Sequence, residues 1–376
     1  MAEEMRTSTR DLRALHDRVA AWLAGRTGGP VEVSELSRPS ANGMSSETLF
    51  FTASWTGRRR VRCVARLAPA AEAVPVFPRY DMEAQFEVMR LARERARVPA
   101  PRALWFEPDP GALGTPFFVM EREDGDVPPD VMPYTFEGWL LDAPPGKRRA
   151  LQDASVGLLA RLHGAPFTSE ELSLLARPGP HLPNGESGGS QPHPSNDGSG
   201  GLRAHVDAQR AYYAWAHGDR PIPLLERAFD WLEANWPEEP GPDVLTWGDA
   251  RIGNVMYRDF RPVAVLDWEM AAVGPRELDL AWMIFLHRFF QDITEAMGLP
   301  GLPDFMRRDD ACRTYQDLTG HPPANMDFHL TYAALRHGVI MARVWRRRIH
   351  FGEQAMPDDP DDLVLHRATL ERMIGD

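Results

Sequence analysis

DVLTWGDARIGNVMYRDFRPVAVLDWE, residues 243–269, is the stretch that decides the fold, because three distinctive polar side chains stand between its short apolar runs. Asp249 is followed five residues later by Asn254, and Asp267 comes after a further apolar run. The flanking apolar runs are 244–245, 255–257 and 263–266. Runs this short are typical of strands, and the polar residues at their ends lie in the connecting loops. The stretch therefore predicts short strands that present two carboxylates and one amide.

These three side chains suit phosphoryl transfer. A carboxylate in the position of Asp249 can orient an acceptor hydroxyl and take its proton. Mg²⁺ is a hard cation that needs few protein ligands beside phosphate oxygens, so Asn254 and Asp267 suffice to hold it. The alternative is that Gly248-Asp249 and Gly253-Asn254 are ordinary turns between strands. Their order before Asp267, each after an apolar run, favours the functional interpretation.

The stretch resembles the Brenner-type signature of the aminoglycoside phosphotransferase (APH) superfamily, whose members have a kinase-like fold. That signature has His-Gly-Asp, then Asn five residues after the Asp, then a later Asp on a strand. The D-x-x-x-x-N spacing also matches the catalytic loop of protein kinases, with Asp267 in the position of their D-F-G aspartate. The resemblance implies that Asp249 is the catalytic base and that Asn254 and Asp267 bind Mg²⁺. Arg251 resembles the basic residue that protein kinases place two residues after the Asp, where it contacts the transferring phosphoryl group.

Two positions around this signature carry structural expectations. Trp247 stands where the family has His. Because that His supports the loop geometry and is not the base, we expect activity to survive the replacement. The family Asp that matches Asp279 buttresses the catalytic loop and does not bind substrate, so we expect the same of Asp279.

Composition limits the class of protein. The 376 residues are enough for two lobes with a sizeable core, and 43% hydrophobic with 26% charged residues is ordinary for a globular protein. Two cysteines, Cys63 and Cys312, form no disulfide framework, and the polar N-terminus is unlike a secretory signal. No apolar run approaches the length of a membrane span. We therefore expect a cytoplasmic protein that binds no membrane, and the sequence leaves its oligomeric state open.

The net charge of −12 argues against nucleic-acid binding, because a phosphate backbone requires a basic face. Lys147 is the only lysine, and its P-P-G-K-R-R context indicates a loop. A kinase-like fold would therefore have to use an arginine as the strand cation that contacts the ATP phosphates. Within the alternating segment 60–67, Arg66 is the candidate, because a guanidinium can bind phosphate oxygens through two parallel hydrogen bonds. Val64, on the same face, would line the adenine side. The alternative for Arg66 is that it is an ordinary exposed arginine on a strand.

Family kinases hold this strand cation with a Glu from the helix that follows. The helix predicted at 81–95 offers Glu83, Gln85 and Glu87. Gln85 is nearest to the family position, whereas charge favours Glu83 or Glu87, so the partner of Arg66 stays open.

The segment 38–48 is a small-residue turn between two predicted strands, which resembles the nucleotide-binding loop of the superfamily. The candidate phosphate-binding residues in it are Ser40, Gly43, Ser45 and Ser46. It contains only one glycine and no G-x-G-x-x-G, so a plain hairpin turn would have the same pattern.

The strand predicted at 116–121 resembles the edge strand that precedes the hinge between the lobes of a kinase. Backbone groups of Glu121, Arg122 and Glu123 would meet adenine there, by order along the chain alone. After this point helical patterns dominate. We therefore predict an α+β, two-lobed protein-kinase-like fold, with an N-terminal nucleotide-binding lobe at 1–122 and a C-terminal catalytic and substrate-binding lobe at 123–376.

Two further segments of the C-terminal half have distinctive compositions. Residues 176–202 are rich in Pro, Gly, Ser and Asn, which predicts a flexible loop. The sequence GPRELDLAW at 274–282 is predicted to open a long helix that continues to about Ala296.

The resemblance implies transfer of the ATP γ-phosphoryl group, with Mg²⁺, to a hydroxyl of a small molecule such as an aminoglycoside. A second interpretation is a hydroxyacyl-CoA kinase, similar to the kinase-like domains fused to some acyl-CoA dehydrogenases. A carboxylate-lined acceptor pocket would favour the first, and an Arg-rich or apolar groove the second. A third interpretation is a pseudokinase that binds nucleotide without catalysis; the retained Asp249, Asn254 and Asp267 argue against it.

Overall fold

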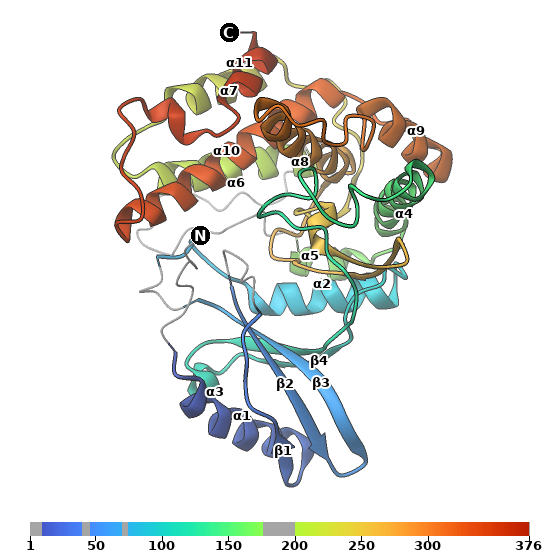
Figure 1. Ribbon diagram of the computed structural model, residues 1–376, viewed down its shortest axis with the longest axis vertical. Coiled ribbons are helices and arrows are strands. Elements are labelled where there is room, and N and C mark those ends of the chain that lie inside the picture. Colours follow the sequence, from blue (N-terminus) through green and yellow to red (C-terminus); the bar gives the residue numbers. More distant parts are fainter. Residues whose placement is uncertain (1–9, 40–45, 70–73, 176–199, 376) are drawn as a thin grey trace.

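The chain folds into a sheet-rich lobe and a larger helical lobe (Figure 1), which confirms the predicted α+β, two-lobed architecture. The computed structural model describes residues 10–39, 46–69, 74–175 and 200–375. The position of the domain boundary at 122/123 stays a prediction. Within the described residues, no helix combines the length and the apolar character that crossing a membrane would require.

The smaller lobe is built on a five-stranded antiparallel sheet with strand order β1-β2-β3-β5-β4. Its strands are β1 Val31–Val33, β2 Glu47–Trp55, β3 Arg58–Leu67, β4 Ala103–Glu107 and β5 Phe117–Glu121. The prediction that the strand before the hinge lies at an edge is wrong. After β4 the chain passes through the short helix α3 (Pro110–Leu113) and returns between β3 and β4, so β5 is paired on both sides and β4 forms the edge.

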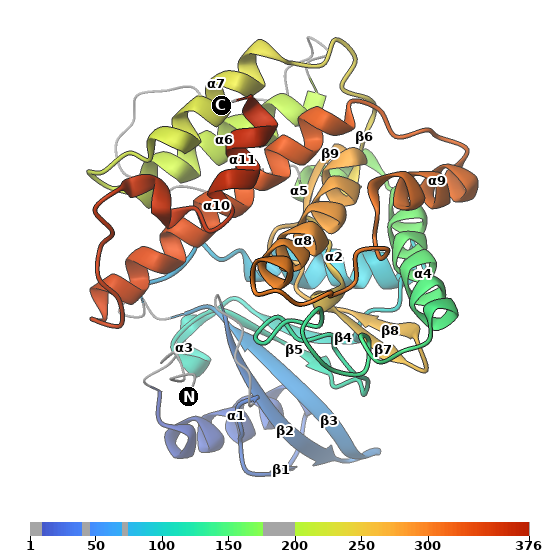
Figure 2. The same cartoon turned by 45° about the horizontal axis from the view of Figure 1, so that its top comes forward.

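Strand periodicity gives the two faces of this sheet different neighbours. The face that carries Leu49, Cys63 and Val119 forms one apolar core with α1 (Leu12–Thr27). The opposite face carries Val64, Arg66 and Phe118; the last packs in the main core together with residues of α2 (Met82–Glu94). In both views α2 lies between the sheet and the helical lobe (Figures 1 and 2). Val64 and Arg66 therefore share the face that is turned toward the helical lobe.

The larger lobe packs long helices around one apolar core. Its helices are α4 Pro145–His163, α5 Ser169–Leu175, α6 Gly200–His217, α7 Pro223–Ala234, α8 Glu277–Ala296, α9 Arg308–Thr319, α10 Met326–His350 and α11 Arg367–Ile374, with the 3-10 turns η2 Ile252–Asn254 and η3 Pro360–Leu363. α10 is in contact with α6, α7 and α8, and it runs across the lobe (Figure 2). The apolar face of α10 therefore connects the helices on either side of it.

Two sequence predictions for this lobe need correction. Residues 176–199 of the predicted flexible loop lie outside the described residues, but Gly200–Leu202 form the first turn of α6. Gly274 and Pro275 do not open the long helix; they end β9 (Ala272–Pro275), and α8 begins at Glu277. The reason is pairing: β9 forms an antiparallel ribbon with β6 (Asp243–Thr246), and a strand end tolerates a proline that has no N–H to donate.

Three histidines that are buried in the helical lobe predict acid sensitivity. Burial lowers the pKa of His287 to about 4, of His329 to about 3 and of His366 to about 4. An unfolded chain binds these protons near pH 6.5. The free energy of unfolding is therefore undiminished above about pH 6.5 and falls as the pH drops toward 4, by up to about 1.4 kcal/mol per histidine and pH unit.

Urea unfolding at pH 7 and pH 5.5 measures this loss. His321→Ala is the control, because it removes an exposed histidine and leaves the buried ones in place. Equal stability at the two pH values would show that the buried rings bind protons as readily in the folded protein as in the unfolded chain.

Candidate active site

Two small antiparallel ribbons position the candidate active site. β6 pairs with β9, and β7 (Val255–Arg258) pairs with β8 (Arg261–Val265). The loop 247–254 connects the two ribbons and ends in η2. The backbone N–H of Leu266 donates to the carbonyl of Asn254 at 2.8 Å, which holds this loop beside the segment that carries Asp267. The loop that carries Asp249 and Asn254 thus lies beside the later segment that carries Asp267.

Asp249 lies at the centre of a hydrogen-bond network. Its Oδ2 accepts bonds from Nδ2 of Asn254 at 2.6 Å and from Nε of Arg251 at 3.1 Å. Its Oδ1 accepts a bond from the indole Nε1–H of Trp282 at 2.8 Å. Three donors from the loop and from α8 therefore fix the orientation of this carboxylate. Sequence reasoning missed Trp282, because an indole on an apolar helix face carries no signal of its own.

Arg251 is held between two carboxylates, Asp249 and Asp130. Burial alone would lower the pKa of Arg251, but these two carboxylates raise it above its ordinary value. The guanidinium is therefore a fixed positive charge beside Asp249. Asp130 was missed by the sequence analysis, because it lies in a segment without periodicity, 121 residues before its partner.

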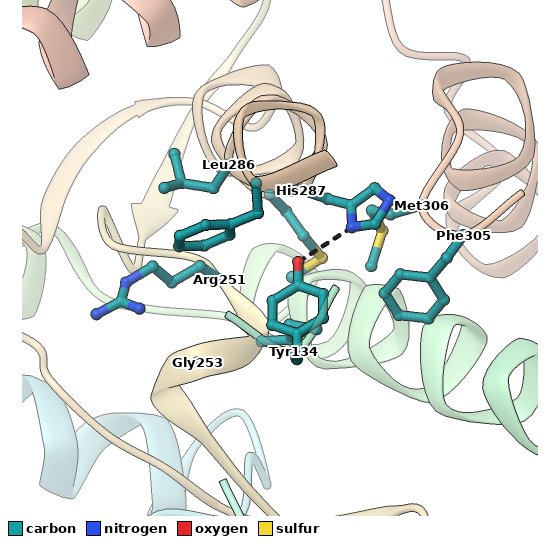
Figure 3. A pocket seen from close by; sticks show the side chains of 10 residues that line it. Tyr134, Arg251, Gly253, Leu286, His287, Phe305 and Met306 are labelled. Atoms are coloured by element: carbon teal, nitrogen blue, oxygen red, sulfur yellow. Dashed lines mark hydrogen bonds between the residues drawn. The ribbon is translucent and has the colours of Figure 1, made fainter. Parts of the chain in front are cut away.

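A small hollow lies behind this arginine, and its walls are mostly apolar. Figure 3 shows Tyr134 hydrogen-bonded to His287 near Phe305, while the guanidinium of Arg251 points away from them. The Tyr134 hydroxyl is 3.0 Å from Nδ1 of His287, and Nε2 of the same ring is 3.1 Å from the carbonyl of Leu302. Because these polar groups are satisfied, the hollow supports the loop and offers little to a ligand.

Asp279 holds the beginning of the loop. Its carboxylate is fully buried, and it accepts the backbone N–H groups of Trp247 at 2.7 Å and Gly248 at 2.8 Å. Nε2 of His163 lies 3.1 Å from the same carboxylate. These contacts are those of a loop support, as the resemblance implied. Gly248 is required there, because its φ is +87° and a Cβ would overlap the carbonyl of Met270.

Trp247 links the loop to the segment that carries Asp267. Its side chain is buried, and Nε1–H lies 2.9 Å from the carbonyl of Leu266 and 3.1 Å from that of Asp267. The ring also packs against Trp268, with centroids 5.9 Å apart. The tryptophan thus braces the loop where the family has histidine.

Arg66 reaches Asp267 from the other lobe. Its Nη2 is 3.0 Å from Oδ1 of Asp267, and its Nη1 donates to the Thr48 hydroxyl at 3.1 Å. Asp267 has a φ of +58°, an uncommon conformation for aspartate that often occurs at functional sites. The pair joins residues 201 positions apart and brings the strand cation and the expected metal ligand together.

The expected partner of Arg66 on α2 is not the observed one. Glu87 forms an ion pair with Arg90 at 2.7 Å, and Nε2 of the buried Gln85 is 3.9 Å from the Met82 sulfur. No ion pair joins Arg66 to Glu83 within the described residues. The physical reason is that Asp267 supplies the carboxylate, so α2 needs no glutamate at this point.

The remaining predicted nucleotide-binding residues are placed only in part. Ser40, Gly43 and Ser45 lie outside the described residues, whereas Ser46 and Val64 are buried.

At the predicted hinge, the backbone N–H of Glu121 donates to the carbonyl of Arg102 at 2.9 Å, and that of Arg122 donates to the carbonyl of Arg62 at 2.8 Å. The guanidinium of Arg122 lies over the Phe50 ring, 4.3 Å from its centroid. These two N–H groups are therefore engaged in the sheet, and the adenine contacts proposed for Glu121, Arg122 and Glu123 stay a prediction.

Comparison with known proteins places the chain in a family. The pattern of the phosphotransferase enzyme family matches residues 38–304, well over half of the sequence. The chain belongs to this family. Phosphotransferase relatives of known structure share its fold: a putative aminoglycoside phosphotransferase from Ralstonia eutropha aligns with a TM-score of 0.65 and 20% identity, covering 95% of this chain and 96% of the other.

Two other solved structures agree with this one at lower similarity. Aminoglycoside phosphotransferase APH(4)-Ia, in a thermostable mutant form, aligns with a TM-score of 0.55 and 17% identity over 95% of this chain and 98% of its own. The macrolide 2'-phosphotransferase MphH from Brachybacterium faecium aligns with a TM-score of 0.50 and 19% identity over 97% of each chain. At these identities the likeness establishes the shared fold.

Curated relatives by sequence have different names. The probable acyl-CoA dehydrogenase IBR3 of Arabidopsis thaliana is 24% identical over 88% of this chain, and the human acyl-CoA dehydrogenase family member 11 is 26% identical over 76%. The matches cover only 39% and 33% of those proteins. The chain therefore spans little more than a third of the length of these relatives.

Proposed function

We propose that the protein transfers the γ-phosphoryl group of ATP, with Mg²⁺, to a hydroxyl of a small molecule. The observation that carries the proposal is the contact of Arg66 with Asp267, which joins the sheet lobe to the loop network around Asp249. Support for the nucleotide comes from the related fold of APH(4)-Ia, which was solved as a ternary complex with ADP and hygromycin B. The proposed lobes remain 1–122 for nucleotide and 123–376 for catalysis and acceptor.

The proposed metal site uses hard oxygen donors. Nδ2 of Asn254 donates to Asp249, so the amide oxygen is the group left for a cation, and Oδ2 of Asp267 lies opposite the oxygen that contacts Arg66. Within the described residues there is no cluster of three or more His, Cys, Asp or Glu that would bind a metal without phosphate oxygens. This donor set fits Mg²⁺, which Asn254 and Asp267 would hold and which would supply charge neutralisation to the phosphates.

The protein's own residues would orient the reaction. Among the described residues, Trp282 alone donates a hydrogen bond to Oδ1 of Asp249, so this oxygen retains capacity to accept one from an acceptor hydroxyl. Arg251, whose Nε is 3.1 Å from Oδ2 of Asp249, would stabilise charge on the transferring group. Arg66 would move part of its interaction from Asp267 to the phosphates. Catalysis would come mainly from positioning and charge stabilisation.

A hydroxyacyl-CoA kinase is the second candidate function. The sequence relatives are named as acyl-CoA dehydrogenases, whereas the structural relatives are named as antibiotic phosphotransferases. These names are compatible with both a cationic antibiotic and an acyl acceptor. Activity toward each class of acceptor distinguishes the two functions.

We expect the purified protein, with ATP and Mg²⁺, to form ADP and a phosphorylated product with one class of hydroxylated acceptor. Aminoglycosides, macrolides and hydroxyacyl-CoAs are to be compared by a coupled ADP assay and by mass spectrometry of the product. Removal of the metal with EDTA should abolish transfer, because the phosphate charge is then not neutralised. Mg²⁺-dependent nucleotide binding without turnover on any class would instead favour a pseudokinase.

A further inference from the structure

The segment 126–134 runs beside the candidate active site and is fixed near both ends. Asp126 exchanges two backbone hydrogen bonds with Tyr257 of β7, each 2.8 Å long. Tyr134, at the other end, is 2% exposed, and its ring lies in the hollow of Figure 3. We call this segment the Asp130 strap. Because both of its ends are held, the backbone that carries Asp130 has little freedom to move.

The guanidinium of Arg251 is held through two of its three nitrogens. Its Nε donates to Oδ2 of Asp249 at 3.1 Å, and its Nη1 donates to Oδ2 of Asp130. Within the described residues Nη2 has no hydrogen-bond partner, although the side chain is only 20% exposed. In Figure 3 the guanidinium points out of the apolar hollow. A planar group that is fixed at two nitrogens cannot rotate, so the third presents its N–H groups in one direction.

The carboxylate of Asp130 is used for Arg251 alone among the described residues. Its Oδ1 is buried and has no hydrogen-bond partner there, and its Oδ2 accepts only from the guanidinium. An aspartate that stabilised its own turn would instead accept backbone N–H groups of the strap. Asp130 therefore contributes to the arrangement of Arg251 rather than to the folding of the strap.

The loop leaves room for this ion pair at Gly253. A Cβ atom on Gly253 would lie 2.5 Å from Nη1 of Arg251 and 2.5 Å from Oδ1 of Asp130, too close for either. The φ of Gly253 is not positive, so glycine is needed here for space and not for backbone conformation. The residue before Asn254 thus accommodates the pair of Arg251 and Asp130.

Two carboxylates around Arg251 have a chemical advantage over one. A guanidinium beside a single carboxylate tends to bind it through two parallel hydrogen bonds. On Asp249 that arrangement would occupy the oxygens that an acceptor hydroxyl needs. Because Asp130 holds Nη1, Arg251 reaches Asp249 through Nε alone, and Nη2 stays available to a phosphate oxygen.

We propose that Asp130 is a positioning residue for phosphoryl transfer, which holds Arg251 so that Nη2 meets the transferring phosphoryl group. This inference rests on the proposed function and adds a residue to its machinery. In the transfer, the acceptor oxygen forms a bond to the γ-phosphorus, and the bond from that phosphorus to the β-bridging oxygen breaks. The acceptor proton passes to Asp249, and ADP leaves. Arg251 stabilises the charge on the phosphoryl oxygens, and Asp130 acts only through Arg251.

Asp130→Asn tests this role, because it removes the charge and keeps the volume. ATP hydrolysis, in which water replaces the acceptor, is followed by ADP release in the presence of Mg²⁺. We expect kcat to fall about 10- to 100-fold, the cost of a misplaced charged group, while KM for ATP changes less than about twofold. A residue that only stabilised the fold would not separate kcat from KM in this way.

Arg251→Gln shows whether the effect passes through Arg251. Once the guanidinium is absent, Asp130→Asn should reduce kcat no further, so the double variant should match Arg251→Gln within about twofold. Losses that multiply in the double variant would overturn the positioning role.

A binding measurement covers the case of slow hydrolysis. Aluminium fluoride with ADP and Mg²⁺ stands in for the transferring phosphoryl group, so it should raise the Tm of the unmodified protein above the value with ADP and Mg²⁺ alone. Asp130→Asn should lose most of this additional rise and keep the rise that ADP and Mg²⁺ cause. An additional rise that survives in Asp130→Asn would refute the proposal.

Asp126→Asn is the matched control. It removes an exposed carboxylate from the same strap and leaves the backbone bonds to Tyr257 in place, so both readouts should stay unchanged. The Asp130 side chain is 35% exposed, so its variants should fold. Neither stabilisation by ADP and Mg²⁺ nor ADP release in the unmodified protein would refute phosphoryl transfer, and the inference with it. Full turnover in Asp130→Asn would leave the function standing and refute the positioning role alone.

Discussion

Asp249→Ala should reduce phosphoryl transfer by about 10²- to 10⁴-fold, because the acceptor hydroxyl loses the carboxylate that orients it and takes its proton. The same change leaves the Trp282 indole without its acceptor and leaves Nδ2 of Asn254 with the backbone carbonyl of residue 249 alone, but it removes no group proposed to bind phosphate. Nucleotide affinity should therefore change little. Turnover is followed by ADP release, and nucleotide binding by the Mg²⁺- and ATP-dependent rise in Tm.

Asp259→Asn serves as the matched control for this prediction. Asp259 lies in the turn between β7 and β8, its side chain is 77% exposed, and its ion pair is with Lys147. Full activity is expected of this variant. Undiminished turnover in Asp249→Ala would refute the assignment of the base, and with it the central role of the loop.

Asp279→Ala should have the largest effect on stability, lowering the free energy of unfolding by about 3–5 kcal/mol. The fully buried carboxylate accepts the N–H groups of Trp247 and Gly248 and contacts Nε2 of His163. Alanine removes the acceptor of both N–H groups and leaves His163 with its Tyr315 contact alone. Transfer should also fall, because the loop that carries Asp249 loses its anchor. Urea unfolding monitored by tryptophan fluorescence measures the first effect, and ADP release the second.

Asp327→Ala is the comparison for this loss of stability. The Asp327 side chain is 83% exposed and pairs with Arg308 at the surface, where an ion pair contributes less than about 1 kcal/mol. Asp279→Asn, which keeps the volume and one acceptor oxygen, should fall between the two alanine variants. A loss in Asp279→Ala no greater than in Asp327→Ala would mean that the buried network does not stabilise the loop.

The sequence by itself predicted the segment that carries the proposed catalytic residues. The fixed order of Asp249, Asn254 and Asp267 between short apolar runs predicted adjoining loops, and hydrogen bonds between residues close in sequence build those loops. Strand periodicity predicted the common face of Val64 and Arg66, whereas the supporting role of Asp279 was implied by the family resemblance. Local periodicity and spacing are recorded directly in the sequence, so they need no knowledge of packing.

Tertiary structure alone decided which distant residues meet. The sequence offered three partners for Arg66 on α2, yet the structure pairs it with Asp267. Nothing in the sequence indicated that Trp282 lies beside Asp249 or that Asp130 pairs with Arg251. Contacts of this kind depend on the register and crossing of packed elements, which single-residue patterns do not encode. The order of the polar residues in the loop was therefore predictable, whereas their contacts with distant side chains arise only when the elements of the two lobes pack together.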